Sequence, residues 1–162
     1  MIASCKSKSK LEESFYETQK KSKIIDLFGL DYSNITLTTT FAECGEWGGH
    51  VEGIKLYSEL NTKLIKLDYY RNALDCKMIM NNQVLTDTVI KKTITLNVKK
   101  QKAVDKYLQI LMSRKLKTKI LMHAGNSFVL KNRDSSLYLE VFDPEKESTT
   151  SYLRLLSTLE LN

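Results

Sequence analysis

The sequence is poor in the residues that most often build catalytic and metal sites. Its 162 residues include two histidines, three cysteines and a single proline. No apolar run approaches the roughly 18 to 20 residues that a membrane-spanning helix requires. The cysteines form no Cys-x-x-Cys pair, so zinc ribbons, zinc fingers and thioredoxin-like motifs are unsupported. The glycine patterns of the common nucleotide-binding loops are also absent, and we expect no cofactor.

The composition is that of one folded domain with an excess of basic residues. Apolar residues make up 42% of the chain, enough to bury a core of ordinary size. The net charge of +6 favours anionic surfaces in general without naming one. Residues 1–23 contain six lysines and three glutamates among scattered apolar residues, a composition typical of a flexible tether. We therefore predict a tether over 1–23 and a single domain over 24–162.

Alternation of apolar and polar residues predicts an antiparallel sheet. The alternation is strict over 35–41, where threonines occupy the face opposite the apolar residues. Two further alternating segments, 50–58 and 64–70, follow after short connections, so the three segments predict a meander. Weaker strand patterns occur at 84–85 and 93–96.

Helical spacing predicts one long helix and a shorter one. Val104, Leu108 and Leu111 recur at this spacing within 98–116, and Asn97 is the expected N-cap. A second helix is expected over 149–159, capped by Ser148 or Thr149. Between the helices, 128–131 and 137–142 predict a hairpin around a polar turn. The predicted class is α+β, a single domain in which one or two helices pack on an antiparallel sheet made of an N-terminal meander and a C-terminal hairpin.

The stretch ECGEWGGH, residues 43–50, gathers one cysteine, the only tryptophan, one histidine and three glycines. It connects the first two predicted strands, and its glycines supply the backbone conformations of a tight connection. One interpretation is therefore a structural turn in which Cys44 is buried. The other is a ligand loop, since an aromatic ring on such a loop offers flat apolar area to a sugar or a protein. The residues of this candidate ligand loop are Glu46, Trp47, His50 and Glu52.

The same segment also contains the residue types of two enzyme sites. Cys44, Glu46, His50 and Glu52 are metal-competent, although only Cys44 and His50 are strong zinc ligands. The His-x-Glu spacing of zinc deaminases is present, but the single proline is not followed by Cys-x-x-Cys, which excludes deamination. A Cys44–His50 pair could supply a thiolate nucleophile. Since no third, orienting residue stands out, we assign no catalytic residue and no metal ligand.

The segment 91–119 is strongly basic. It contains ten lysine or arginine residues against one acid, Asp105, and so carries a charge of +9. A helix that presents Lys99, Lys102 and Lys106 outward suits an acidic protein or an anionic surface as partner. No aromatic or amide side chains are interleaved on that face to read bases, so nucleic acid is disfavoured as a partner.

The first residues indicate a location for the chain. Ile2-Ala3-Ser4-Cys5 resembles the lipobox of bacterial lipoproteins, and CGEWGGHVE is similar to a loop of uncharacterised lipoproteins from Bacteroidota-type bacteria. The polar run that follows Cys5 suits a tether between an anchor and a domain. The resemblance implies lipid attachment at Cys5, contact with the membrane through that anchor, and a location in the bacterial cell envelope.

Three functions remain open at this point. The leading hypothesis is a non-enzymatic, lipid-anchored envelope protein that binds an unknown ligand. The first alternative is a small enzyme or metal-binding protein centred on residues 43–52. The second is a cytoplasmic basic module that binds nucleic acid or protein.

A lipid on Cys5 would leave the other two cysteines as a pair in a compartment where disulfides persist. Cys44 follows the first predicted strand and Cys76 follows the third, and a meander can bring these two ends to one edge of the sheet. We therefore predict a Cys44–Cys76 disulfide, which requires α-carbons within about 7 Å of each other. Such a bond would remove Cys44 as a nucleophile and as a metal ligand.

Overall fold

The structure, a computed structural model, describes residues 35–45, 48–58, 64–77, 81, 88–117, 125–133 and 135–161. Four strands come first along this part of the chain: β1 (Ile35–Thr40), β2 (Val51–Ser58), β3 (Ile65–Asn72) and β4 (Thr88–Thr95). They are followed by helix α4 (Val98–Lys117), strands β5 (Asn126–Lys131) and β6 (Tyr138–Asp143), and helix α5 (Glu147–Leu159). The predicted α+β class is confirmed.

The strands form one antiparallel sheet in the order β4-β3-β2-β1-β5-β6. Strands β1 to β4 make the N-terminal meander, and the β5–β6 hairpin joins the sheet at β1. Strand β1 therefore lies inside the sheet between two segments that are far apart in sequence. Its Thr36, for example, is opposite Lys55 of β2 and also opposite Lys131 of β5.

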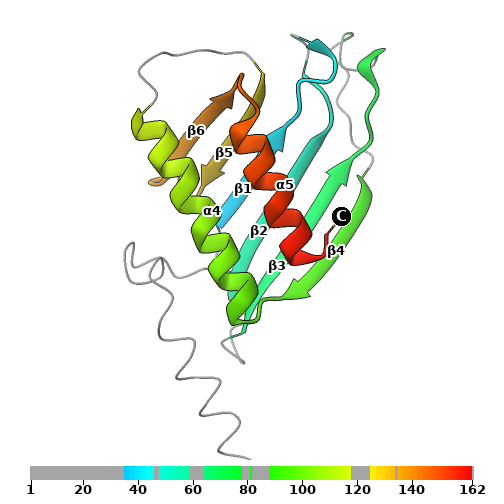
Figure 1. Cartoon of the computed structure of the whole chain (residues 1–162). Helices are drawn as coiled ribbons and strands as arrows, with labels where there is room; N and C mark the ends of the chain where they lie inside the picture. The colour runs from blue at the N-terminus through cyan, green and yellow to red at the C-terminus, as the bar shows by residue number, and fades with distance from the viewer. Residues whose placement is uncertain are drawn as a thin grey trace, which may run out of the picture.

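Both helices cover the same face of the sheet (Figure 1). In β1, Ile35 and Leu37 are buried toward the helices, because successive side chains of a strand point to opposite faces. The large side chains that are fully buried in this layer come from several elements and include Phe128, Leu111, Tyr152, Leu67, Ile54 and Leu56. Strands and helices thus contribute jointly to one core. Within the described residues, no helix packs on the opposite face, which we call the open face.

Helix α4 begins where the sequence predicts it. The Asn97 side chain accepts a hydrogen bond from the Lys100 backbone N–H at 3.0 Å, as an N-cap does. Gln101 is buried at the same end and donates from Nε2 to the Leu96 carbonyl oxygen at 2.9 Å. These two bonds fix the tight passage from β4 into the helix.

Helix α5 begins earlier than predicted, and the predicted cap was wrong. The helix starts at Glu147, and neither Ser148 nor Thr149 caps it. Instead Asp143, the last residue of β6, accepts hydrogen bonds from the backbone N–H groups of Ser148 (3.1 Å) and Thr149 (2.7 Å). Lys146 adopts a left-handed conformation with φ 60°, which turns the chain so that the upstream carboxylate reaches these donors.

Strand β4 also differs from the prediction, since it runs over eight residues rather than over 93–96. It is an edge strand, and its side chains are mostly exposed on both faces. Lys91 and Lys92 are adjacent in this strand, so they interrupt the alternation of apolar and polar residues. Charged side chains at the edge of a sheet also protect it from pairing with another chain. The predicted tether (1–23) and the short strand predicted at 84–85 lie outside the described residues.

Candidate functional site

The ECGEWGGH segment folds into a closed loop between β1 and β2. The Phe41 backbone N–H donates to the His50 carbonyl oxygen at 3.1 Å, which pairs the two ends of the loop. Inside it, Cys44 N–H donates to the Gly48 oxygen at 2.6 Å. Gly45 and Gly48 have φ values of 68° and 88°, a region that residues with a Cβ rarely adopt. The structural interpretation of this segment therefore accounts for both glycines.

Gly49 is required for a different reason. A Cβ at this position would fall on the Phe41 carbonyl oxygen and would lie 2.8 Å from the Glu43 backbone nitrogen. Both contacts are with backbone atoms, which cannot rotate away as a side chain can. The two arms of the loop thus approach each other so closely that only glycine fits between them.

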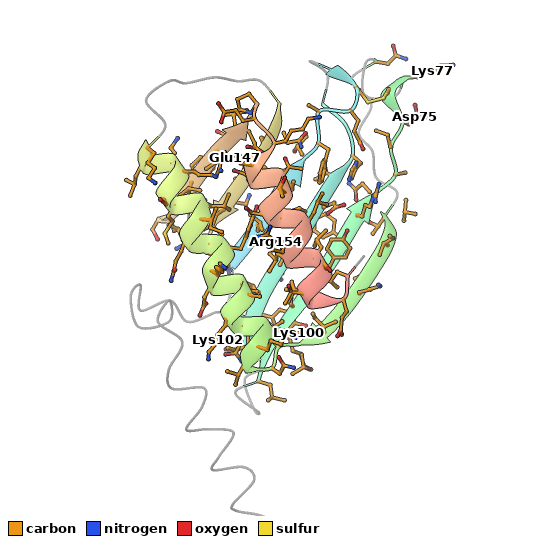
Figure 2. All side chains as sticks on the ribbon, viewed as in Figure 1. Asp75, Lys77, Lys100, Lys102, Glu147 and Arg154 are labelled. Carbon is orange, nitrogen blue, oxygen red and sulfur yellow. A yellow bond between two sulfur atoms is a disulfide. The ribbon has the colours of Figure 1, made fainter. Side chains whose placement is uncertain are left out.

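A disulfide joins this loop to the end of β3. Cys44 and Cys76 are bonded, and their α-carbons lie 5.4 Å apart, as the meander geometry suggested. Next to Cys76, the Asp75 carboxylate accepts a hydrogen bond from the Lys77 N–H at 2.9 Å. Figure 2 labels Asp75 and Lys77 at this end of the molecule. The bond links the first β-connection to the segment after β3 and leaves Cys44 without a free thiol.

A second connection ties the loop to β5 and α5. The side chain of Asn126, the first residue of β5, accepts a hydrogen bond from the Ala42 N–H at 2.8 Å. Its Nδ2 donates to the Thr149 hydroxyl at 2.8 Å, and that hydroxyl donates to Asp143 at 2.7 Å. The loop is therefore held from two sides, by the disulfide and by this chain of polar contacts.

His50 lies at the centre of a buried polar cluster. Its side chain is 5% exposed, and its ring stacks on Phe41 with centroids 4.2 Å apart. Nδ1 contacts the Glu43 carboxylate, and Nε2 lies 3.2 Å from Glu52 Oε1. The same Glu43 oxygen accepts a hydrogen bond from the His50 backbone N–H at 3.3 Å. Each ring nitrogen therefore has a carboxylate as its partner.

Glu52 extends this cluster into the layer between the sheet and the helices. Its side chain is 4% exposed, and Arg71 Nε of the neighbouring strand lies 3.9 Å from its Oε1. Within the described residues, Oε2 has no hydrogen-bond partner at normal distance, and neither does the buried Tyr152 hydroxyl of α5. Burial and the charge of Glu52 raise the pKa values of Tyr69 and Tyr152, so both phenols stay protonated. A carboxylate and two tyrosines thus meet between sheet and helix.

The cluster favours a charged imidazole. Burial lowers the pKa of His50, but the hydrogen bonds that its ring makes to Glu52 and Glu43 outweigh it, and the net pKa is raised. For Glu43, burial opposes ionisation, while the contacts with His50 lower its pKa overall. A protonated ring donates to both carboxylates at once, which neither neutral tautomer can do.

This geometry bears directly on the enzyme sites considered from the sequence. Glu43 and Glu52 lie against opposite ring nitrogens of His50, so the three cannot converge on one ion. Within the described residues, no group of histidine, cysteine and acidic side chains is arranged to hold a metal ion. The Cys44–His50 nucleophilic pair is not formed either, because Cys44 is bonded to Cys76 and both ring nitrogens of His50 contact carboxylates. We therefore assign the His50 cluster to the core.

The structure describes two of the four residues of the candidate ligand loop. His50 and Glu52 are 4% and 3% exposed, respectively, so their side chains face the core rather than a surface ligand. Glu46 and Trp47, the other two residues of that prediction, lie outside the described residues, as does Cys5. Among the described helices, none has the length and apolarity to cross a bilayer.

A groove that the sequence analysis missed lies on the open face. Its lining residues come from β1, β2, β5 and the β5–β6 turn, and its volume is about 520 Å³. Among the described residues, three of the lining side chains are basic and none is acidic; the lining consists of Thr36, Lys55, Lys131, Asn132, Arg133 and Ser135. We call this the basic groove.

Comparison with known proteins adds no family to this geometry. No family model matches the chain. No curated protein and no solved structure matches it either. The site must therefore be interpreted from its own residues.

The basic segment 91–119 is partly neutralised by α5. Lys100 donates to Glu160 at 2.8 Å and so lowers the pKa of that carboxyl, and Arg114 contacts Glu147. Lys99, Lys102 and Lys106 are exposed, as predicted for the outer side of the helix. Lys100, Lys102, Glu147 and Arg154 mark the helical side of the molecule in Figure 2. The basic groove lies on the other face of the sheet from helix α4.

Proposed function

We propose that this protein is a lipid-anchored binding module of the bacterial cell envelope, attached to the membrane through Cys5. The observation that carries the proposal is the Cys44–Cys76 disulfide. Structural disulfides persist in oxidising compartments outside the cytoplasm, whereas cytosolic thiols are kept reduced. The disulfide also leaves Cys5 as the one cysteine of the chain that is available for acylation.

Binding is favoured over catalysis by what the candidate residues of the 43–52 segment do. Cys44 is consumed by the disulfide, and His50 is engaged by Glu43 and Glu52 on its two ring nitrogens. These residues hold a loop in place. The open face of the sheet, by contrast, presents a basic groove in which Lys55, Lys131 and Arg133 form no ion pair within the described residues.

Metabolic labelling tests the anchor. The protein is expressed from its own gene in its native host and labelled with an alkyne analogue of palmitate. We expect label on the wild-type protein and recovery in the membrane fraction, and loss of both for Cys5→Ala. The double variant Cys44→Ala/Cys76→Ala is the matched control and should keep the label. Label that persists without Cys5, or its absence from the wild type, would refute the anchor.

Thiol trapping tests the compartment independently. Cells are treated with a maleimide reagent before lysis, and the mass of the protein reports how many cysteines react. Neither Cys44 nor Cys76 should react unless a reductant is added first. Reaction of both in untreated cells would place the protein in a reducing compartment and favour the alternative of a cytoplasmic binding module.

A further inference from the structure

We propose that the basic groove on the open face is a binding site for a phosphate group borne by a small molecule or a lipid headgroup. This inference names a ligand for the binding module proposed above and rests on that proposal for its biological setting. The groove has a volume of about 520 Å³ and is lined only by polar and basic residues. It therefore suits a charged ligand better than an apolar one.

The sheet register brings the two lysines of the groove to either side of one threonine. Thr36 of β1 is directly opposite Lys55 of β2 and directly opposite Lys131 of β5. Since neighbouring strands lie about 4.8 Å apart, the backbones of the two lysines are separated by about 10 Å with the threonine between them. Two ammonium groups and one hydroxyl can thus converge on an anion above the middle strand.

The third cation comes from a turn that is held in place by its own hydrogen bonds. Asn132 Oδ1 accepts from the Leu137 N–H at 3.0 Å, and the Asn132 N–H donates to the Leu137 carbonyl at 3.2 Å. Ser135 completes the turn in a left-handed conformation with φ 59°. Arg133 belongs to this turn at the end of the Lys131 strand and lines the same groove as the two lysines.

Among the described residues, the basic side chains of the groove outnumber the acids that lie beside them. Within the described residues, none of Lys55, Lys131 and Arg133 forms an ion pair. Asp68 is opposite Lys55 in the sheet, but its Oδ1 accepts hydrogen bonds from the hydroxyls of Tyr57 (3.2 Å) and Thr93 (2.7 Å).

On the other side of the groove, Glu140 of β6 accepts a hydrogen bond from the Tyr138 hydroxyl at 3.3 Å. Hydroxyl groups thus occupy hydrogen-bonding positions of Asp68 and Glu140, and three basic residues of the groove stand against these two described acids. The groove keeps a positive potential that attracts an anion from solution.

The donor set favours phosphate over other anions. A guanidinium binds two oxygens of one tetrahedral group at once, and two lysines add point charges that match a dianion. A single carboxylate has too few oxygens to use all these donors. Nucleic acid is disfavoured because no aromatic side chain lines the groove to stack on bases.

The test uses the full chain carrying Cys5→Ser, which needs no lipid to remain in solution. Glucose 6-phosphate and inorganic phosphate are titrated by calorimetry and by amide chemical shifts. Saturable binding with shifts in β1, β2, β5 and the β5–β6 turn is expected. Lys55→Gln/Lys131→Gln should weaken it by about tenfold or more, because two charge-assisted contacts are lost.

Two further variants separate a site from general charge attraction. Lys102→Gln/Lys106→Gln removes the same charge from the exposed side of α4 and should leave the affinity within about twofold, as expected for distant exposed charges. Thr36→Val keeps the charge and removes the central hydroxyl, and it should weaken binding measurably. Equal losses in the two double variants, or no saturable binding to any phosphate probe, would overturn the proposal.

Two other probes identify the source of the phosphate. Vesicles of phosphatidylglycerol in phosphatidylcholine test whether the phosphate belongs to a lipid headgroup. Binding to these vesicles that requires Lys55 and Lys131 would support the proposal and identify a lipid as the ligand. Tighter binding of a single-stranded DNA oligonucleotide than of either phosphate probe or the vesicles would overturn it. These titrations use protein without a lipid. A negative result in them therefore does not contradict lipid attachment at Cys5, and a negative result in the labelling experiment does not contradict phosphate binding in the groove.

Discussion

The two faces of the sheet are built from the same strands but do different things. On the covered face, residues such as Leu37 and Leu130 pack in the core under the two helices and are excluded from water. On the open face, their neighbours Thr36 and Lys131 line a basic groove. The difference arises from the alternation of side chains along each strand, since adjacent residues point to opposite sides. One strand thus contributes both to the core and to the exposed groove.

The buried and the exposed charged residues lie on different faces of the sheet. His50 and Glu52 carry the residue types of a catalytic site, yet they lie on the covered face and hold the loop to the sheet. Lys55 and Arg133 have no motif around them, yet they lie on the open face. Residue type alone therefore does not show which side chains a ligand could reach, because this depends on the face of the sheet on which each one lies.

The largest effect is expected from a core substitution on the covered face. Phe128 is completely buried and packs near Tyr107 and Tyr152, with ring centroids 6.5 and 5.8 Å away. Phe128→Ala should lower the free energy of unfolding by about 3 to 5 kcal/mol, because it removes apolar area and leaves a cavity. Denaturant unfolding followed by circular dichroism measures the change.

The next residue in β5 is the matched control for this substitution. Val129 points to the open face and is only half-buried. Val129→Ala should cost about 1 kcal/mol or less. Equal costs at Phe128 and Val129 would contradict the contrast between the faces.

Loss of the disulfide is expected to have the second largest effect. The double variant Cys44→Ala/Cys76→Ala removes a bond that spans a sequence separation of 32. The free energy of unfolding should fall by about 3 to 4 kcal/mol, because the unfolded chain regains the freedom that the closed loop denied it. Reduction of the wild-type protein should give a similar loss, while Cys5→Ser should give none. A wild-type protein insensitive to reductant would show that the bond contributes nothing.

The His50 cluster predicts a pH dependence of stability. The raised pKa of His50 means that its contribution is complete below its ordinary value of 6.5 and is lost as pH rises through the folded value. The lowered pKa of Glu43 means that its contribution is complete above 4.5 and is lost as pH falls through the lower folded value. Stability from this pair is therefore complete between about pH 4.5 and 6.5 and declines on both sides.

A variant isolates this contribution. In His50→Gln, the decline of stability above pH 6.5 should be flatter than in the wild type, because the titrating group is gone. Unfolding midpoints measured from pH 5 to pH 9 compare the two proteins. A wild-type protein that became more stable through this range, relative to His50→Gln, would reverse the sign and disprove the charged state of the imidazole.

The smallest effect on stability is expected on the open face. Lys55→Gln/Lys131→Gln removes two charges that form no ion pair within the described residues, so the free energy of unfolding should change by no more than about 0.5 kcal/mol. A slight gain is favoured, since the charges repel each other. Thermal unfolding in phosphate-free buffer measures this change in stability. A loss comparable to that of the Cys44 and Cys76 variant would make these lysines structural.

The sequence predicted most elements because their patterns are local. Alternation in β1 and helical spacing in α4 reflect burial on one side of each element, and the Asn97 cap lies next to the helix it begins. Strand β4 was predicted too short, since an edge strand is exposed on both faces and has no alternation. The cap of α5 was assigned wrongly, because Asp143 reaches over a turn that depends on the left-handed Lys146.

The basic groove was missed for a related reason. Lys55 lies far from Lys131 and Arg133 in the sequence, and only the pairing of β1 with both β2 and β5 brings it close to them. Strand order is a property of the whole fold and leaves no local signal. Cys44 and Cys76 were paired more easily, because both lie within the meander, whose neighbours in sequence are neighbours in space.

The central position of β1 has a consequence for how the protein folds. Its pairing with β2 joins adjacent segments, whereas its pairing with β5 joins opposite halves of the sequence, and such distant contacts cost more loop-closure entropy and form more slowly. We expect the meander and its disulfide to form before β5 docks. The groove between Lys55 and Lys131 would then be among the last features assembled, so an anion bound there would slow unfolding without accelerating folding.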